Sequence, residues 1–303
     1  MTKRGWLLFA AMGFIWGIPY FLIRVAVKQL EPPVIVFCRT VLAASVLLVV
    51  ANRAGAIRPA LRRWRSVLVF AIVEMAIPWI LLTTAEEHLA SGLTALIVAC
   101  VPIVGTIAAF ALGDRHALRF VRIVGIACGL GGVAVLVGRD LTSDNAPPVW
   151  SIAEVLIVVV CYATAPFWAD RRLADVPSTG VIAVSLSIVT VIYAPIAATR
   201  LPTSVPSVNV LLAVLGLALI CTALAFIVFF RLIAEAGPAK AGLITFVNPV
   251  VAVALGALFL DEVITAATVA GFLLVMTGCW LATRPPPVDA DAPTELELLE
   301  GLA

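Results

Sequence analysis

The sequence has 303 residues, of which 63% are apolar and only 13% charged, with a net charge of +2. A soluble domain is about half apolar and about a quarter charged, so a soluble fold is excluded. The basic residues form short clusters rather than one continuous face, so their pattern gives no indication of nucleic-acid binding. All six cysteines lie in apolar runs without C-x-x-C spacing, so no metal site, disulfide framework or cofactor is predicted.

Ten apolar stretches are each long enough to cross about 30 Å of hydrocarbon, which takes roughly 17 to 25 helical residues. Such stretches must form helices or a closed barrel, and continuous apolar runs without alternation exclude the barrel. No cleavage pattern follows the first stretch, so it is expected to remain as a membrane helix. The expected spans are 6–27, 34–51, 66–85, 92–112, 119–138, 150–168, 178–198, 208–230, 240–260 and 264–282. We therefore predict an all-α membrane protein with ten transmembrane helices.

The Lys and Arg residues between these stretches indicate the orientation. If the N-terminus lies inside, fifteen of them fall in inner segments and three, Lys28, Arg139 and Arg200, in outer ones. The side that keeps the basic residues is cytoplasmic, so both termini are predicted to lie inside. The proline-rich, acidic residues 285–303 are expected to form a disordered cytoplasmic tail.

An internal repeat relates the two halves of the chain. Residues 98–137 and 245–281 both contain a proline, small apolar residues, an acidic turn and a helix with glycines seven apart. Five helices per half is an odd number, so the second half is predicted to be inverted relative to the first. The expected units are residues 1–140 and 141–284. Inverted repeats are a recurring plan of secondary transporters, in which the halves alternate access to a midplane site.

The order of several loose motifs carries a family resemblance. GFIWGIPYFLIRVAV opens the chain, VFCRTVLAASVLL follows, and VPIVGTIAAFALGD and NPVVAVALGALFLDE each precede a glycine-containing helix. Together they resemble the ten-helix EamA family of the drug/metabolite transporter superfamily over residues 5–283. That family usually has Gly-Glu at the acidic turn, whereas this chain has Gly113-Asp114 and Asp261-Glu262. The difference leaves the role of that glycine open.

The resemblance implies a central cavity lined by helices 1, 3, 4, 6, 8 and 9, in a chain that works as a monomer in the lipid of a bacterial inner membrane. Within the family it resembles YddG-type exporters, which implies export of uncharged or aromatic amino acids. Another metabolite or drug, such as a nucleoside, a sugar phosphate or a cationic drug, is the alternative substrate. An intramembrane enzyme would normally show clustered His, Asp or Ser groups, and a channel a continuous polar pore, and neither pattern is present.

Candidate solute-binding residues are polar or aromatic side chains within the apolar spans. Glu74 lies mid-helix, where placing an ionised group costs roughly 2.5–3.5 kcal/mol. It either binds a substrate ammonium, or couples transport to protons, or is a neutral, hydrogen-bonded structural acid. Aromatic rings could enclose an apolar solute, and hydroxyl and amide groups could bind it, although packing roles are equally open. The candidates are Trp16, Tyr20, Glu74, Trp79, Thr83, Tyr162, Phe167, Trp168, Thr245 and Asn248.

Prolines within the spans are candidate hinges, because each removes a backbone hydrogen bond and bends its helix. They are Pro19, Pro78, Pro102, Pro166 and Pro249, and Pro102 and Pro249 occupy repeat-related positions. Ordinary tolerance of membrane helices for proline is the alternative for each.

Three further expectations concern charges and glycines. Arg39, near the outer end of the second helix, is expected to extend its charged head to the membrane interface. Arg24, Glu86, Glu87 and His88 are expected to pair as an outer gate. Gly129, Gly131 and Gly132 are expected to permit close helix approach rather than phosphate binding.

Overall fold

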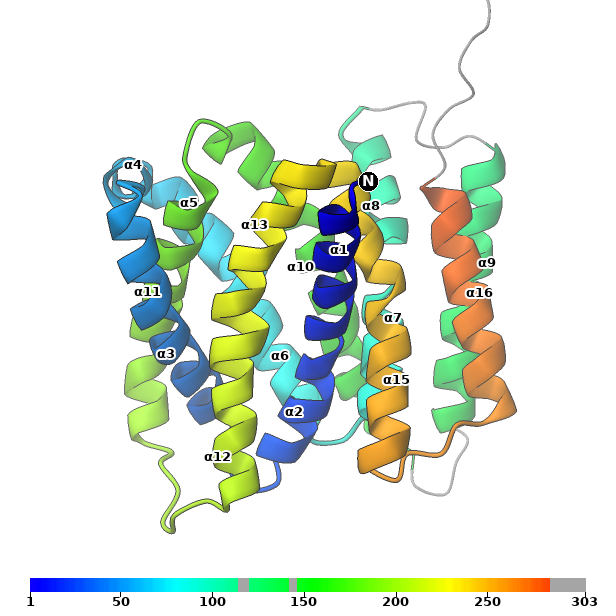
Figure 1. Ribbon diagram of the computed structural model, residues 1–303. Helices are drawn as coiled ribbons and strands as arrows, with labels where there is room; N and C mark the ends of the chain where they lie inside the picture. Colours follow the sequence, from blue (N-terminus) through cyan, green and yellow to red (C-terminus); the bar gives the residue numbers. More distant parts are fainter. Residues whose placement is uncertain (114–119, 142–145, 284–303) are drawn as a thin grey trace, which may run out of the picture.

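The computed structural model describes residues 1–113, 120–141 and 146–283, and the expected tail, residues 285–303, lies outside them. Within the described residues, nine helical spans are long and apolar enough to cross a membrane, and a shorter apolar helix follows them. The predicted all-helical architecture is confirmed (Figure 1). Large apolar side chains are exposed around the bundle, including Leu7 at 73% and Leu258 at 74%, as expected for a surface that faces lipid.

The spans are numbered here in chain order, and five of them consist of more than one helical segment. Span 1 is α1 (Lys3–Ile15) with α2 (Ile18–Ala26), span 2 is α3 (Pro32–Arg53), and the short α4 (Ile57–Arg62) leads to span 3, which is α5 (Trp64–Ala71), η1 (Ile72–Ala76) and α6 (Ile77–Ala85). Span 4 is α7 (Ser91–Val98) with α8 (Val101–Ala111), span 5 is α9 (Phe120–Leu141), span 6 is α10 (Val149–Leu173) and span 7 is α11 (Ser178–Ala198). Span 8 is α12 (Val208–Leu215), η3 (Gly216–Leu224) and α13 (Ala225–Ala236), span 9 is α14 (Pro238–Gly242), η4 (Leu243–Phe246) and α15 (Asn248–Phe259), and span 10 is α16 (Ala266–Ala282).

The chain direction inverts between the halves. Span 1 starts at the upper side of Figure 1, whereas span 6 starts at the lower side, because five crossings separate them. The last helix, α16, ends at the same side as the start of α1 (Figure 1). We call that side the N-terminal side and the opposite one the distal side.

Four of the five candidate hinge prolines coincide with breaks in their spans. Pro19, Pro78, Pro102 and Pro249 are each the second residue of a new segment. An N–H in the first turn of a helix has no partner within that helix, so proline sacrifices no hydrogen bond there. Pro166 differs, because it lies inside the continuous helix α10. Span 8 is interrupted without proline, by the nine-residue π-helical segment η3.

Glycines set the close packing of α9 on α16. A Cβ added at Gly278 would lie 2.4 Å from the backbone nitrogen of Gly129, and one at Gly132 would lie 2.8 Å from that of Val275. The expectation of close helix approach through Gly129 and Gly132 is confirmed, whereas a Cβ at Gly131 would meet nothing within 4 Å.

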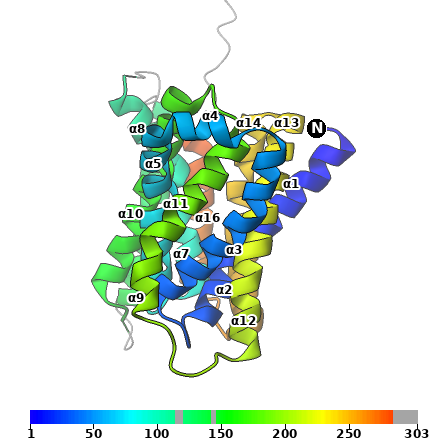
Figure 2. The same cartoon turned by 90° about the vertical axis from the view of Figure 1, so that its left-hand side faces the viewer.

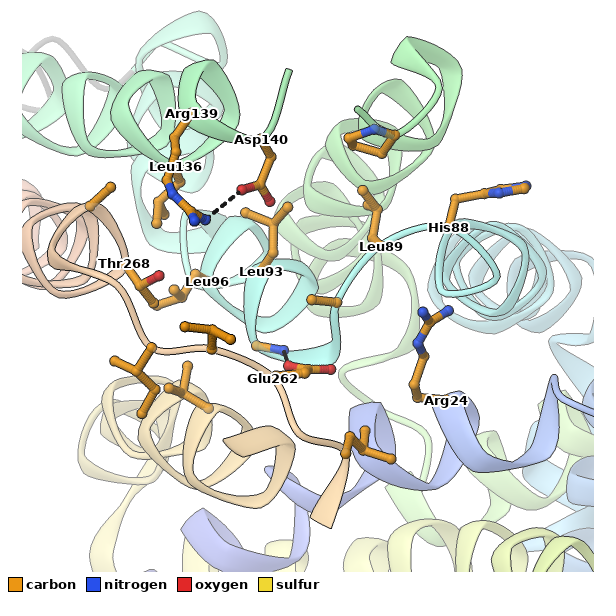
Figure 3. A pocket seen from close by; sticks show the side chains of 18 of the residues that line it. Arg24, His88, Leu89, Leu93, Leu96, Leu136, Arg139, Asp140, Glu262 and Thr268 are labelled. Atoms are coloured by element: carbon orange, nitrogen blue, oxygen red, sulfur yellow. Dashed lines mark hydrogen bonds and ion pairs between the residues drawn. The ribbon is translucent and has the colours of Figure 1, made fainter. Parts of the chain in front are cut away.

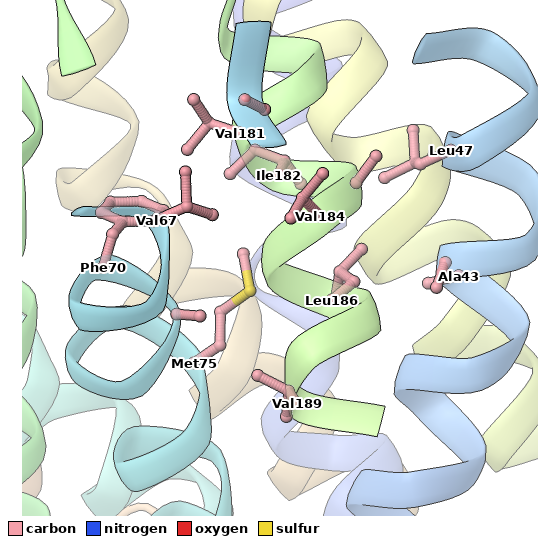
Figure 4. Packing of buried hydrophobic residues seen from close by; sticks show 14 of the residues in the cluster. Ala43, Leu47, Val67, Phe70, Met75, Val181, Ile182, Val184, Leu186 and Val189 are labelled. Atoms are coloured by element: carbon pink, nitrogen blue, oxygen red, sulfur yellow. The ribbon is translucent and has the colours of Figure 1, made fainter. Parts of the chain in front are cut away.

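The largest buried cluster lies among α3, α5, η1 and α11, on the opposite side of the bundle from α9 and α16. Met75 and Leu186 are fully buried there, beside Leu47 and Val67 (Figure 4). In the view of Figure 2, α3 and α11 cross one another at this end of the molecule. The cluster packs η1, which carries Glu74, against the second half of the chain.

Candidate functional site

Arg39 lies inside the bundle and not at the membrane interface. Its side chain is only 9% exposed, and its Nε donates a 2.8 Å hydrogen bond to the hydroxyl of Thr222 on η3. Its guanidinium carbon lies 3.8 Å from the centre of the Trp79 ring, a cation–π contact. The expectation that Arg39 extends to the interface is therefore wrong, because the hydroxyl and the ring hold its head among spans 2, 3 and 8.

Within the described ranges, no acid forms a salt bridge with Arg39. The salt bridges among the described residues involve Arg63, Arg139 and Arg200, and none involves Arg39. Apart from the bond from Nε, the guanidinium donates no hydrogen bond within the part of the chain that the structure describes. A cation held inside membrane spans in this way is costly, and such residues typically face a solute pathway.

Thr222 owes its position to the π-helical turn. Its hydroxyl donates to the carbonyl of Leu217, five residues earlier, at 2.8 Å and accepts from Arg39. A π-turn is uncommon and is frequent at functional sites. Sequence analysis missed Thr222, since nothing in the sequence marks a π-turn.

A second π-turn, η1, carries Glu74. One of its carboxylate oxygens is buried and has no hydrogen-bond partner among the described residues. Glu74 is close enough to Cys161 and Tyr162 on α10 to interact with them electrostatically. Tyr162 interacts with Trp79 and also lies within electrostatic range of Arg39. Arg39, Trp79, Tyr162 and Glu74 thus form one connected group across spans 2, 3 and 6.

Of the two aromatic candidates on span 1, only Tyr20 is linked to this group. Tyr20 interacts electrostatically with both Arg39 and Glu86. Trp16, at the break between α1 and α2, packs with its ring centre 4.7 Å from that of Phe229 on α13. We call Tyr20, Arg39, Glu74, Trp79, Tyr162 and Thr222 the central cluster, and a solute contact by Trp16 remains a prediction.

Four of the remaining candidates donate hydrogen bonds to backbone carbonyls and not to side chains of the central cluster. The hydroxyl of Thr83 donates to the Trp79 carbonyl at 2.6 Å and that of Thr245 to the Gly242 carbonyl at 2.9 Å, both within their own spans. The Trp168 indole donates to the Ser66 carbonyl at 3.0 Å, while Phe167 is half-buried on the same helix. Correctly oriented, the Asn248 amide donates to the carbonyls of Ile244 and Gly13, which joins span 9 to span 1. Solute contacts by these five residues remain predictions.

A carboxylate connects the halves at the distal side. Glu262, in the turn between α15 and α16, accepts hydrogen bonds from the backbone N–H groups of Ser91 at 2.7 Å and Gly92 at 3.0 Å. These are the first two residues of α7, where the helix dipole favours a negative charge (Figure 3). We call this contact the distal latch.

The expected ion pairs of an outer gate are not formed among the described residues, so that expectation is wrong. Arg24 donates to the backbone carbonyl of Glu86 and not to a carboxylate. His88 packs edge-on against Trp150, with ring centres 4.8 Å apart. Glu86 itself is fully buried, and neither of its carboxylate oxygens has a hydrogen-bond partner among the described residues. Burial and the nearby Glu262 raise the pKa of the Glu86 carboxyl well above its usual range.

A cavity of about 420 Å³ opens beside the distal latch (Figure 3). Arg24, Lys28, His88, Glu262 and Thr268 line it, together with apolar side chains of spans 4, 5, 9 and 10. None of the ten candidate binding residues lines this cavity. The cavity thus lies at one end of the bundle, and the central cluster lies deeper, with Arg39 packed on Trp79.

Comparisons with known proteins agree with this architecture. Residues 3–138 and 149–284 each match the EamA-like transporter family. The "Uncharacterized inner membrane transporter YedA" of Escherichia coli is 30% identical over 297 residues, covering 94% of this chain and 95% of the relative. The "Uncharacterized transporter YvbV" of Bacillus subtilis is 24% identical over 286 residues, covering 92% and 91%. One solved structure with 19% identity has a TM-score of 0.66 and covers 93% of this chain and 97% of its own, which shows the fold.

The two matched ranges together span most of the chain, and each contains five of the helical spans described above. The relatives are transporters and none is described as an enzyme. The chain therefore belongs to the EamA-like transporter family and is a multi-pass membrane transporter.

Proposed function

We propose that this chain is a secondary transporter that exports uncharged amino acids, aromatic ones included, by alternating access across an inner membrane. The observation that carries the proposal is the central cluster. Two side chains of opposite charge type, Arg39 and Glu74, lie inside the spans without a salt bridge among the described residues. Tyr162 lies within electrostatic range of both. An α-amino acid carries one cationic and one anionic group, so the two side chains complement it.

Aromatic rings favour a solute with an uncharged side chain. Tyr20, Trp79 and Tyr162 bring three aromatic rings next to the charged groups. Such rings bind apolar and aromatic side chains by stacking and by release of water. A charged amino acid would carry its extra charge into this environment without a partner.

The inverted halves and the broken spans support alternating access. The distal latch joins the turn after span 9 to the start of span 4, so release of Glu262 would separate elements of the two halves. The breaks before Pro102 and Pro249 lie in these same spans and are the proposed hinges. By the distribution of Lys and Arg, the distal side is the outer side, and the N-terminal side is cytoplasmic.

Transport in proteoliposomes tests the proposal. The purified protein is reconstituted with internal alanine or tryptophan, and counterflow of the labelled amino acid is measured beside uridine, a hexose phosphate and a cationic dye. Saturable counterflow of alanine and tryptophan is expected. Transport of one of the other solutes alone would refute the amino-acid assignment, while conversion of a solute without translocation would refute a carrier.

Glu74→Gln separates the two explanations of Glu74. Loss of the negative charge is expected to weaken apparent affinity for alanine and tryptophan at unchanged protein yield. Asp175→Asn, which makes the same change at an exposed site, is the matched control. Wild-type transport by correctly inserted Glu74→Gln would make Glu74 a neutral structural acid.

A further inference from the structure

Among the residues that the structure describes, the guanidinium of Arg39 makes contacts through its face and through Nε. The face rests on the Trp79 ring at 3.8 Å, and Nε donates to Thr222 at 2.8 Å. The two terminal amino groups make no hydrogen bond within the residues that the structure describes. A guanidinium carries five N–H donors in a planar fork, and its two terminal amino groups together match the two oxygens of a carboxylate.

The contacts of Arg39 fix the direction of that free edge. Stacking on Trp79 sets the plane of the guanidinium, and the bond to Thr222 sets its rotation within the plane. Because Trp79 belongs to the first half and Thr222 to the second, both halves are needed to hold the group. An arginine held in this way loses little further freedom when it binds a ligand, which favours affinity.

The charged and titratable groups around Arg39 leave its charge without a direct partner. Tyr20, Tyr162, Cys221 and Glu86 are the neighbours within electrostatic range. Of these only Glu86 is a carboxyl group, and it forms no ion pair with Arg39. An anion brought by a ligand would therefore meet a buried cation whose charge the described protein groups do not neutralise.

We propose that Arg39 binds the carboxylate of the transported solute, through a bidentate contact from its two terminal amino groups. The inference rests on the proposed function and deepens it, since it assigns the two ends of the amino acid. The carboxylate lies at Arg39, the ammonium lies towards Glu74, and the side chain stacks among the aromatic rings. Trp79 then has two roles, because it orients Arg39 and borders the space for the solute.

Paired analogues of tryptophan test this assignment. Indolepropionate keeps the carboxylate and lacks the ammonium, whereas tryptamine keeps the ammonium and lacks the carboxylate. Inhibition of tryptophan counterflow by each is compared in wild type, Arg39→Lys and Arg39→Gln. Both variants are expected to weaken inhibition by indolepropionate by about 10- to 100-fold, as for loss of a charge-assisted hydrogen-bonded contact. Inhibition by tryptamine is expected to change little.

Arg39→Lys keeps the positive charge and removes the planar fork, so it addresses the bidentate contact without leaving the site uncharged. Arg63→Lys, at an exposed arginine, is the matched control. An unchanged ratio of the two inhibition constants in Arg39→Gln would overturn the proposal. A purely packing role would lower both inhibitions together and would also overturn it.

Calorimetry of the purified protein separates this inference from the proposed function. If tryptophan is not transported but indolepropionate binds to wild type and not to Arg39→Gln, the amino-acid assignment fails and the carboxylate site stands. If indolepropionate binds neither protein, or binds both equally, Arg39 is not a carboxylate site.

Discussion

Replacing Glu262 by Gln tests the distal latch. In the wild type, one carboxylate accepts two backbone N–H groups, at 2.7 and 3.0 Å, at the start of α7. Gln keeps one oxygen, so the variant loses the charge and one acceptor. A hydrogen bond to a charged group contributes about 1.5–3 kcal/mol, and we take the lower end because Glu262 is half-buried. A loss of about 1.5 kcal/mol shifts the opening equilibrium about tenfold towards the open distal side.

Cysteine labelling measures that shift. Leu93 lines the distal cavity and is 7% exposed, so Leu93→Cys reports access from this side once the native cysteines are replaced. A membrane-impermeant maleimide is expected to label Leu93→Cys about tenfold faster in the Glu262→Gln background. Asp261→Asn is the control, because Asp261 is exposed at a φ of 55°, a conformation that Asn also tolerates. Equal rates in all backgrounds, or the same acceleration in Asp261→Asn, would refute the latch.

Three further predictions follow from the buried groups. Burial raises the pKa of Glu86 in the closed distal side, so the stabilisation from its protonated form is present at low pH and is lost as pH rises through that pKa. Labelling of Leu93→Cys should therefore accelerate with pH in the wild type and lose this dependence in Glu86→Gln. An identical pH profile in the two proteins would contradict the assignment. Gly278→Val places a side chain where a Cβ already lies 2.4 Å from the Gly129 nitrogen, so thermal unfolding should occur at lower temperature, whereas Gly131→Ala, with nothing within 4 Å, should change it little. Trp79→Ala removes the ring beneath Arg39 and should raise the apparent KM more for tryptophan than for alanine, and equal increases would indicate packing alone.

The sequence determined the architecture because lipid imposes one strong constraint. Backbone groups must pair within each span, so long apolar stretches with few charges could only be helices. The clustered glycines of α9 predicted close helix approach, which the close backbone approach at Gly129 and Gly132 confirms, but their partners on α16 were not predicted. Four of the five hinge prolines located breaks in the spans, since a ring without an N–H is best accommodated at the start of a helical segment, whereas Pro166 lies inside α10.

The tertiary structure decided which polar groups meet. Arg39 lies near the end of its span in the sequence, which suggests an interfacial position, yet Thr222 and Trp79 hold it inside. Thr222 is 183 residues away from Arg39, and the π-turn that presents its hydroxyl has no sequence signature. Glu262 and Ser91 are likewise 171 residues apart. Local patterns report which face of a helix is apolar, but contacts between distant spans depend on how the helices cross, and only the folded chain fixes that geometry.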